Sequence, residues 1–423
     1  MTEYRMARPG EWDACIEMAN YVFSVEHSPT DFEKLLPKVY QAGPEMAGIH
    51  RVAVREDGKI VGLIAVLPQT MSVAGKSLRV GYVGTVSVHP KARGEGHMKR
   101  MMGDWIRELE GHCDFLVLDG QRQRYGYFGF AQGGMEYEFV VDKSNIRHVF
   151  GKDKRDGCCA SDEEKRDACC ALDKDKRDGC CLSDGAASDR ITFGPLFAPE
   201  HREEALAFAV RMNEARPAYV VRERDQLEAV LESFCGEPTG VWINGALAGY
   251  LIRSGANNIA ELAVQDASEI GPIVAAYMRE RALDVLRIHV PVYDRAQVAA
   301  LSAFAEEVRL SNGGSSLYRI FDFANVLEAY LTLKAQTIGI SDGCFSAVIE
   351  GQPVTVQVTE GKVTVSRSTL PGALQLGREQ AQELLLSQTA AAGSHAGISD
   401  AVWKTIPRDW FPLPLFKYMP DTF

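Results

Sequence analysis

The stretch from Val80 to Met102 constrains the fold of this chain more than any other part of it. It begins with an apolar, β-branched run that ends at Pro90, which is typical of a strand buried on at least one face. A basic loop with two glycines follows, and from Met98 to Leu109 apolar residues return at the spacing of an amphipathic helix. The stretch therefore predicts a strand, a glycine-containing turn and a helix, the order found in α/β folds.

The turn between the predicted strand and helix is a candidate anion site. The first amides of a helix lack partners within the helix, and the helix dipole adds positive potential there. Gly94 and Gly96 would let the backbone approach a ligand closely, and Arg93 adds a positive charge. This combination favours a pyrophosphate. An ordinary strand-to-helix turn is the alternative, because a short glycine motif alone is weak evidence.

The same residues resemble a known family. Val86-Ser-Val-His-Pro90 followed by Arg93-Gly-Glu-Gly96 is similar to the acyl-coenzyme A loop of GNAT acetyltransferases. Met98 replaces the small residue that ends the family pattern, a departure that is similar to the enhanced-intracellular-survival (Eis) branch of aminoglycoside and lysine acetyltransferases. The resemblance implies that acetyl-coenzyme A is the co-substrate. It also implies that the following residues bind it: Val86, Val88, Arg93, Gly94, Glu95, Gly96, His97 and Met98.

A second motif, Arg124-Tyr-Gly-Tyr-Phe-Gly-Phe130, predicts a tight turn whose aromatic rings close over a cleft. In the Eis branch a Tyr-Gly-x-Phe-Gly motif holds the tyrosine proposed to protonate the departing coenzyme A thiolate, and here that tyrosine is Tyr125. A phenol with an unperturbed pKa of about 10 stays protonated at neutral pH and can donate. Two alternatives are that Tyr125 only packs, or that Tyr127 acts instead.

The last stretch of the chain is rich in aromatic residues and prolines, which predicts a buried tail: Trp403, Trp410, Phe411, Phe416, Tyr418 and Phe423. In the Eis branch the chain ends in a phenylalanine that enters the cleft of the first domain, and its carboxylate is proposed to take the proton of the attacking amine. The resemblance gives this role to Phe423. A terminal carboxylate has an unperturbed pKa of about 3.5, so holding a cationic amine is its alternative role. Filling an apolar groove is a third.

The length of 423 residues predicts two or three domains. Residues 1–150 show the β-α-β-β-β-α-β order of a GNAT domain. Residues 191–324 repeat that order as a second, degenerate GNAT-fold domain, in which Gln265-Asp-Ala-Ser-Glu269 has neither glycine nor arginine and should not bind coenzyme A. Residues 325–423 resemble the sterol-carrier-like α+β domain of the Eis branch. The predicted fold class is thus α/β with an α+β end.

Residues 151–190 contain three similar eleven-residue units with many charges and six paired cysteines. This composition predicts a solvated, disordered linker, and a soft-metal or redox device is the alternative. The other four cysteines, Cys15, Cys113, Cys235 and Cys344, lie in apolar contexts and are expected to be small buried residues. Since the sequence has no C-x-x-C pair, we expect no bound metal.

A formal net charge of −11 argues against nucleic acid and favours cationic substrates. No signal peptide is visible, and the longest apolar run is too short to span a bilayer, which predicts a cytoplasmic protein without a membrane partner. The resemblance implies acetyl transfer to a primary amine of an aminoglycoside-like substrate, a polyamine or a lysine side chain, in a homo-oligomer, specifically a hexamer. A non-catalytic acyl-coenzyme A sensor or scaffold is the alternative.

Overall fold

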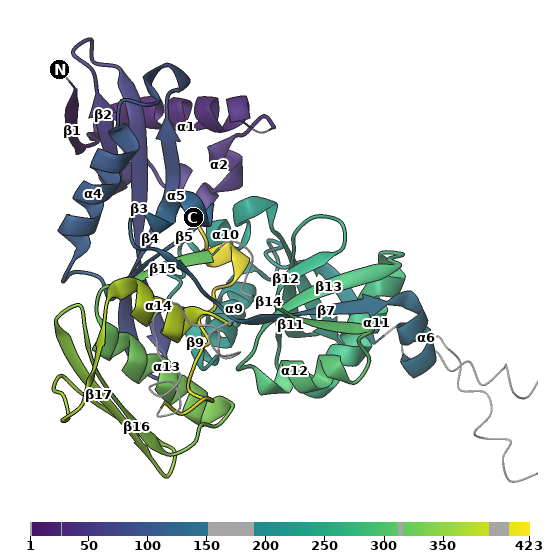
Figure 1. Cartoon of the computed structure of the whole chain (residues 1–423). Helices are drawn as coiled ribbons and strands as arrows, with labels where there is room; N and C mark the ends of the chain where they lie inside the picture. Colours follow the sequence, from purple (N-terminus) through teal and green to yellow (C-terminus); the bar gives the residue numbers. More distant parts are fainter. Residues whose placement is uncertain (1, 27, 151–189, 312–315, 389–405) are drawn as a thin grey trace, which may run out of the picture.

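The computed structural model of the chain describes residues 2–26, 28–150, 190–311, 316–388 and 406–423. Nearly all of the charged, cysteine-rich repeat at 151–190 and also Trp403 lie outside the described residues. Three β-sheets form three bodies, and the C-terminus lies where they meet (Figure 1). The mixed α/β class predicted from the sequence is confirmed.

The first sheet has eight strands in the order β1-β2-β3-β4-β5-β15-β6, with β9 paired to β3. The strands are β1 (Glu3–Met6), β2 (His50–Val54), β3 (Ile60–Val73), β4 (Lys76–Val88), β5 (Phe115–Asp119), β6 (Ala131–Gln132), β9 (Ala218–Val220) and β15 (Ser316–Ile320). One face packs on α1 (Trp12–Glu26), α2 (Phe32–Leu35) and α3 (Pro37–Tyr40), and the other on α4 (His97–Leu109). The sheet therefore separates two apolar cores.

Helix α4 forms where the apolar spacing predicted it. Met101, Met102 and Trp105 are buried against the sheet, and the Trp105 indole donates to the Ile64 carbonyl at 3.0 Å. The apolar stripe fixes which side of α4 faces the sheet, and so where its N-terminus lies at the end of β4.

The second sheet has seven strands in the order β14-β7-β13-β12-β11-β10-β8. They are β7 (Glu136–Asp142), β8 (Ile191–Pro195), β10 (Glu237–Ile243), β11 (Ala246–Arg253), β12 (Asn258–Val264), β13 (Val285–Pro291) and β14 (Glu307–Ser311). Helices α6 (Lys143–Phe150), α11 (Ile270–Glu280) and α12 (Arg295–Ser302) cover one face, and α9 (Arg202–Glu214) and α10 (Leu227–Leu231) the other. This body has the same plan as the first.

Three strands pair with the sheet on the other side of the boundary at residue 150: β9, which pairs with β3 of the first sheet, and also β7 and β15. β7 pairs with β13 and β14 of the second sheet, although it precedes residue 150. β15 lies within residues 191–324 but pairs with β5 and β6 of the first sheet. Figure 1 shows β7, in blue, among teal strands, and the green β15 beside β5. The sheets thus do not follow the boundaries at 150 and 324, because strand pairing depends on open edges rather than on the order of the chain.

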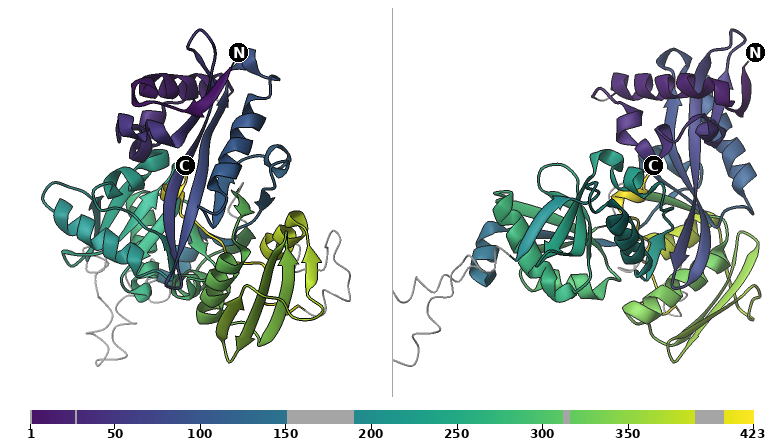
Figure 2. Two further views of the ribbon diagram at one scale, coloured as in Figure 1. Left: turned by 90° about the vertical axis from the view of Figure 1, so that its left-hand side faces the viewer. Right: turned by 180° about the vertical axis from the view of Figure 1, so that it is seen from behind.

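The third body is a four-stranded sheet in the order β18-β17-β16-β19. It comprises β16 (Gly343–Ile349), β17 (Gln352–Thr359), β18 (Lys362–Ser366) and β19 (Leu374–Leu376), with α13 (Phe323–Thr337) and α14 (Arg378–Leu386). The long β3–β4 hairpin reaches down to α13 (Figure 2). There Tyr330 contacts Met71, and Lys76 forms an ion pair with Glu328. The third body is therefore fixed to the first.

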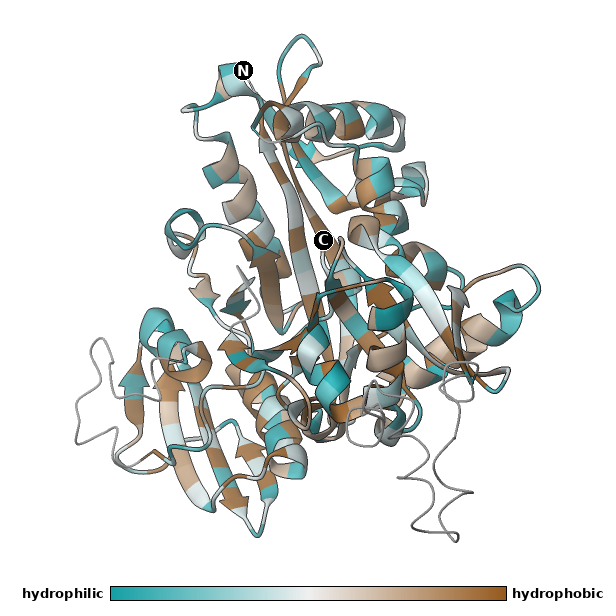
Figure 3. Cartoon of the chain, turned by 90° about the vertical axis from the view of Figure 1, so that its right-hand side faces the viewer, coloured by the Kyte–Doolittle hydropathy of each residue, from teal (hydrophilic) through white to brown (hydrophobic). Residues whose placement is uncertain are grey.

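The tail over residues 406–423 runs from the third body to the first and is largely buried, as predicted. Its backbone bonds to α14 through Leu413 and Leu385 at 2.7 Å, and to the end of the first domain through Leu415 and Met135 at 2.8 Å. In Figure 3 the C-terminus lies among strands that carry brown, apolar segments. Within the described residues, no helix has the length and apolar character needed to cross a bilayer.

Candidate active site

The first sheet opens between two parallel strands. β4 pairs with β5 only from Val80 to Tyr82, yet β4 continues to Val88. Its other edge pairs with β3. In the described chain, the β5-facing edge of β4 beyond Tyr82 therefore has no strand partner. Open backbone groups on such an edge can pair with an extended ligand as an added strand.

A β-bulge lies at this opening. The β3–β4 register shifts between Leu63 and Ala65, and Thr85 opposite this shift has a φ of +48°. A β-branched residue rarely adopts a positive φ, and bulges change the direction in which the backbone groups point. The Thr85 hydroxyl bonds to the Tyr40 hydroxyl at 2.8 Å, and that hydroxyl lies 3.2 Å from His50 Nε2. Buried contacts thus hold the bulge that lies between Val83 and Val86.

The predicted anion loop connects β4 to α4. Gly94 and Gly96 have φ values of +85° and +82°, so both use the left-handed conformation that favours glycine. Gly96 caps α4 and has no side chain, so the first amides of this 13-residue helix receive no side-chain cap from it. Arg93 forms an ion pair with Glu26 at 2.5 Å, and Glu95 pairs with Arg55 at 3.2 Å. The loop presents its backbone amides, as an anion site requires.

His97 and Met98 turn their side chains inward. The His97 ring is buried, with the Tyr4 hydroxyl 2.8 Å from Nδ1 and Glu95 3.1 Å from Nε2. Met98 packs against the α4 core. Of the two, only the backbone amides are therefore candidates for ligand contact, whereas the side chains anchor the helix.

Tyr125 lies in α5 (Arg122–Gly126), beside the end of β5. Its side chain is buried, and a methyl group at Gly120 would come within 2.5 Å of Tyr125 Cε2. Burial raises the pKa of Tyr125, so its phenol is protonated at neutral pH. Tyr127 is 67% exposed, and its ring lies 4.8 Å from the Lys99 ammonium. The structure thus separates the two tyrosines of the motif.

Phe423 is buried on the other strand of the opening. A methyl group at Gly84 would lie 2.7 Å from Phe423 Cδ1 and 2.9 Å from its carboxyl carbon. The ring centroids of Phe423 and Tyr40 are 6.5 Å apart. The tail therefore ends against β4 one residue before the bulge at Thr85.

Tyr82 and Asp119 link the two sides of the opening. The Tyr82 hydroxyl donates to Asp119 at 2.5 Å, and Ser316 and Lys417 also donate to Asp119, at 2.8 and 3.0 Å. Burial opposes ionisation of Asp119, but the Lys417 ammonium and the hydrogen bonds from Tyr82 and Ser316 together outweigh it and lower the pKa of this carboxyl. Burial and Asp119 raise the pKa of Tyr82, and a backbone hydrogen bond from Phe423 acts in the opposite direction. The sequence analysis missed this cluster, since only the end of a strand at Asp119 could have indicated it.

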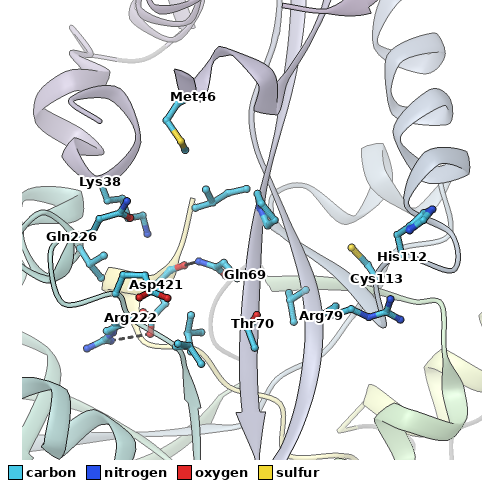
Figure 4. A pocket seen from close by; sticks show the side chains of 17 residues that line it. Lys38, Met46, Gln69, Thr70, Arg79, His112, Cys113, Arg222, Gln226 and Asp421 are labelled. Carbon is cyan, nitrogen blue, oxygen red and sulfur yellow. Dashed lines mark hydrogen bonds and ion pairs between the residues drawn. The ribbon is translucent and has the colours of Figure 1, made fainter. Parts of the chain in front are cut away.

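A cavity of about 440 Å³ lies between the first and second bodies, beside the tail. Figure 4 shows Lys38, Arg222, Gln226 and Asp421 on one side of the β3–β4 strands, and Arg79, His112 and Cys113 on the other. None of the predicted site residues lines this cavity. It is therefore distinct from the opening between β4 and β5.

The corresponding loop of the second sheet is closed by its own side chains. β12 and β13 pair only at Asn258 and Ile259, but the Leu262 carbonyl beyond them accepts from Gln297 at 3.2 Å. Asp266 accepts from the Ser268 amide at 2.9 Å, and Glu269 pairs with Arg190. Strand edge and loop are thus occupied from within. The described residues also contain no group of three or more histidine, cysteine or acidic side chains placed to hold a metal ion.

An opened parallel strand pair, a glycine loop before a helix and a buried tyrosine together define an acyl-coenzyme A-dependent transferase. Residues 3–132 match the family model of the acetyltransferase (GNAT) domain. Residues 3–132 therefore form an acetyltransferase (GNAT) domain. Enzymes of this family take their acyl group from acyl-coenzyme A, acetyl-coenzyme A among them, and pass it to an acceptor.

Solved structures share the fold over the whole chain. The chain is similar to a GCN5-related N-acetyltransferase from Kribbella flavida (14% identity, TM-score 0.62) and to one from Anabaena variabilis (16% identity, TM-score 0.61). It is also similar to Eis1 from Mycobacterium abscessus (13% identity, TM-score 0.60). Each comparison covers 100% of both chains. No curated protein sequence matches the chain.

Proposed function

We propose that this protein transfers an acetyl group from acetyl-coenzyme A directly to a primary amine of a cationic substrate. The observation that carries the proposal is the opening between β4 and β5, which Tyr125 borders on one side and Phe423 on the other. The pantetheine arm would pair with β4 along Val86 and Val88, and the amides from Arg93 to Met98 would hold the pyrophosphate. Both reactants are then positioned before they react.

The proposed reaction needs no covalent enzyme intermediate. The amine nitrogen attacks the thioester carbonyl carbon, a backbone amide near the bulge polarises the carbonyl oxygen, and the carbon–sulfur bond then breaks. Tyr125 donates its phenolic proton to the departing thiolate. Its raised pKa supports this role, because the proton is present at the pH where the amine reacts.

Phe423 is proposed to receive the amine at the other side of the opening. Its carboxyl group would hold the ammonium form of the substrate and take the proton that the attack releases, directly or through a water molecule. Asp119 is a poorer candidate, because the Lys417 ammonium already pairs with it and keeps its pKa low. A carboxylate at Phe423 and the net charge of −11 both favour cationic acceptors.

Replacing Tyr125 by phenylalanine tests the proton donor. We expect kcat in a thiol-release assay to fall by roughly two orders of magnitude, the usual contribution of a positioned acid, with coenzyme A affinity unchanged. Tyr127→Phe is the matched control, since that ring is exposed and should leave kcat unaltered. Equal rates for wild type and Tyr125→Phe would remove Tyr125 from the mechanism.

The acceptor class is tested with the same assay over aminoglycosides, polyamines, lysine and lysine-containing peptides. Thiol release with at least one cationic amine, and none with neutral alcohols, is the expected result. Coenzyme A binding without thiol release for any amine would instead support the sensor or scaffold.

Two further proposals concern the whole chain and depend on the resemblance to the Eis branch. We propose that the third body, a four-stranded sheet with α13 and α14, has a sterol-carrier-like fold. We also propose that the chain assembles as a hexamer. Sedimentation equilibrium should then give a mass near six times the 46.5 kDa of one chain, and a monomeric mass would contradict the assembly.

A further inference from the structure

Three side chains from distant parts of the chain hold the three residues before Phe423. Lys38 in α3 donates to the carbonyls of Pro420 and Thr422, at 2.6 and 2.5 Å. Gln69 in β3 donates to the Asp421 carbonyl at 2.8 Å. Arg222, which follows β9 in the chain, pairs with the Asp421 carboxylate through two hydrogen bonds of 2.8 and 2.9 Å. Every residue from Pro420 to Thr422 is thus fixed by a side chain from outside the tail.

Lys38 is an unusual residue for its place. Its side chain is buried, with 6% exposure, and its amino group donates to two backbone carbonyls. Its pKa is lowered to about 7, mainly by burial; Asp421 opposes this shift, and Arg222 and Lys417 add to it. Burying an amino group is costly, and an apolar side chain of similar length would fill the same volume at lower cost. Packing alone therefore does not account for a lysine here.

The tail has a second contact of the same kind where it leaves the third body. Lys334 in α13 is also buried and donates to the carbonyls of Trp410 and Pro412, at 3.2 and 3.1 Å. In both places an ammonium group joins two carbonyls that are two residues apart. The Lys334 contact at Pro412 lies eleven residues before Phe423, whereas the Lys38 contact at Thr422 lies directly before it. Lys334 thus anchors the tail where it leaves the third body, and Lys38 holds the end of the tail.

The cavity beside the tail leaves space into which the tail end could move if the Lys38 contact were lost. Lys38, Gln69 and Arg222 all line this space of about 440 Å³, together with Asp421 (Figure 4). A tail end without these hydrogen bonds could relax into the cavity and withdraw Phe423 from Gly84. Because the Thr422 carbonyl is joined to the nitrogen of Phe423, a small shift at Thr422 moves the reacting end directly.

We propose that Lys38, assisted by Gln69, is a positioning residue that holds Phe423 in the opening between β4 and β5. The inference rests on the proposed role of Phe423 in the reaction. Lys38 does not touch the reacting atoms in this view. It keeps the end of the tail at the distance from the thioester that the reaction needs, and a misplacement of about 1 Å can cost a factor of roughly one hundred in rate.

The test is a double-mutant cycle in the full-length protein, with Lys38→Met, deletion of Phe423, and both together. We expect Lys38→Met to lower kcat roughly ten- to hundred-fold without changing the affinity for coenzyme A, and the double variant to be no slower than the deletion alone. Carboxypeptidase should release Phe423 from Lys38→Met faster than from wild type. Lys334→Met is the matched control, with kcat and release of Phe423 within about threefold of wild type, because the end of the tail stays fixed.

The outcomes separate the inference from the proposed function. Full activity after deletion of Phe423 would remove that residue from the mechanism and the role of Lys38 with it. A slow deletion variant together with a fully active Lys38→Met would overturn the inference alone, as would losses that add in the double variant. If thermal unfolding shows that Lys38→Met is not folded, Gln69→Leu replaces it in the same cycle, because it removes only the contact to the Asp421 carbonyl.

Discussion

Gly84 and Gly120 carry no functional group, but each leaves the space that a candidate reacting residue fills. A methyl group at Gly84 would overlap Phe423, and one at Gly120 would overlap Tyr125. Contacts below 3.0 Å are not tolerated between such atoms, so the neighbouring side chain would have to move. The two glycines therefore lie on opposite sides of the opening and allow a ring to approach the backbone on each.

Substituting Gly84 by alanine should displace Phe423 and lower kcat at least about tenfold, while the affinity for coenzyme A is retained, because positioning contributes strongly to rate. Steady-state kinetics and calorimetric titration with coenzyme A measure the two effects separately. Gly10→Ala is a suitable control, since a methyl group there meets nothing within 4 Å. An unchanged kcat for Gly84→Ala would mean that Phe423 does not need its observed position.

The sequence predicted the residues of the site that belong to short motifs, and missed those that depend on distant partners. Arg93 and Gly96 lie in the connection between β4 and α4 and Tyr125 lies in α5, and short motifs pointed to all three as candidates. Lys38 contacts residues more than 380 positions away, and no local pattern around Leu36-Pro37-Lys38 indicates that. A buried charge becomes visible only when its partner is in place.

At the scale of elements, a buried charge network joins the tail to the second body. Arg222 makes two hydrogen bonds to Glu261 in β12, at 3.0 and 2.8 Å, besides its two to Asp421. Arg216 lies 2.8 Å from the same Glu261, and the Tyr250 hydroxyl donates to it at 2.7 Å. Burial alone would raise the pKa of Glu261, but Arg222 and Arg216 outweigh it and lower this pKa to about 2. The second body thus holds the η8 turn (Met419–Asp421) of the tail through paired charges.

Replacing Glu261 by glutamine should destabilise the protein by about 3–5 kcal/mol, because it leaves two arginines buried with one carboxylate partner fewer. Urea unfolding at pH 7 measures this loss. Asp284→Asn is the control, since Asp284 pairs with Lys143 at the surface and should contribute less than about 1 kcal/mol. Similar losses for both variants would contradict the assigned weight of the buried network.

The pH dependence of stability should show the same carboxylate. A folded-state pKa lowered from 4.5 to about 2 adds stability that is present above pH 4.5 and is lost as the pH falls from there towards 2. The free energy of unfolding of wild type should therefore fall more steeply from pH 5 to pH 2 than that of Glu261→Gln. Parallel curves for the two proteins would exclude the shift.

Most elements lie where periodicity placed them, whereas their partners did not follow from it. The strand that the sequence predicts before Pro90 and the helix that it predicts from Met98 to Leu109 are found as β4 and α4. β7 and β15 are short strands, and either could close any open sheet edge. Which strands pair depends on the whole fold, so local sequence patterns do not predict the exchange of strands between the sheets.

For the whole molecule, the first and second bodies should differ in their affinity for coenzyme A. The loop of the first presents glycine amides and Arg93, and that of the second is occupied by Asp266, Glu269 and Gln297. Calorimetric titration should therefore give one coenzyme A per chain, and Arg93→Ala should weaken this binding. A stoichiometry of two, or binding that persists undiminished in Arg93→Ala, would contradict the assignment.

The exchange of β7 and β15 determines how this protein could be divided. A fragment that stops at residue 150 would lack β15, which pairs with β5, and would contain β7 without its partner strands. Both unpaired strands would promote aggregation. A contiguous piece of the gene therefore encodes neither of these two bodies with its complete sheet. A gene rearrangement that preserves the fold must keep the segments that encode both sheets together.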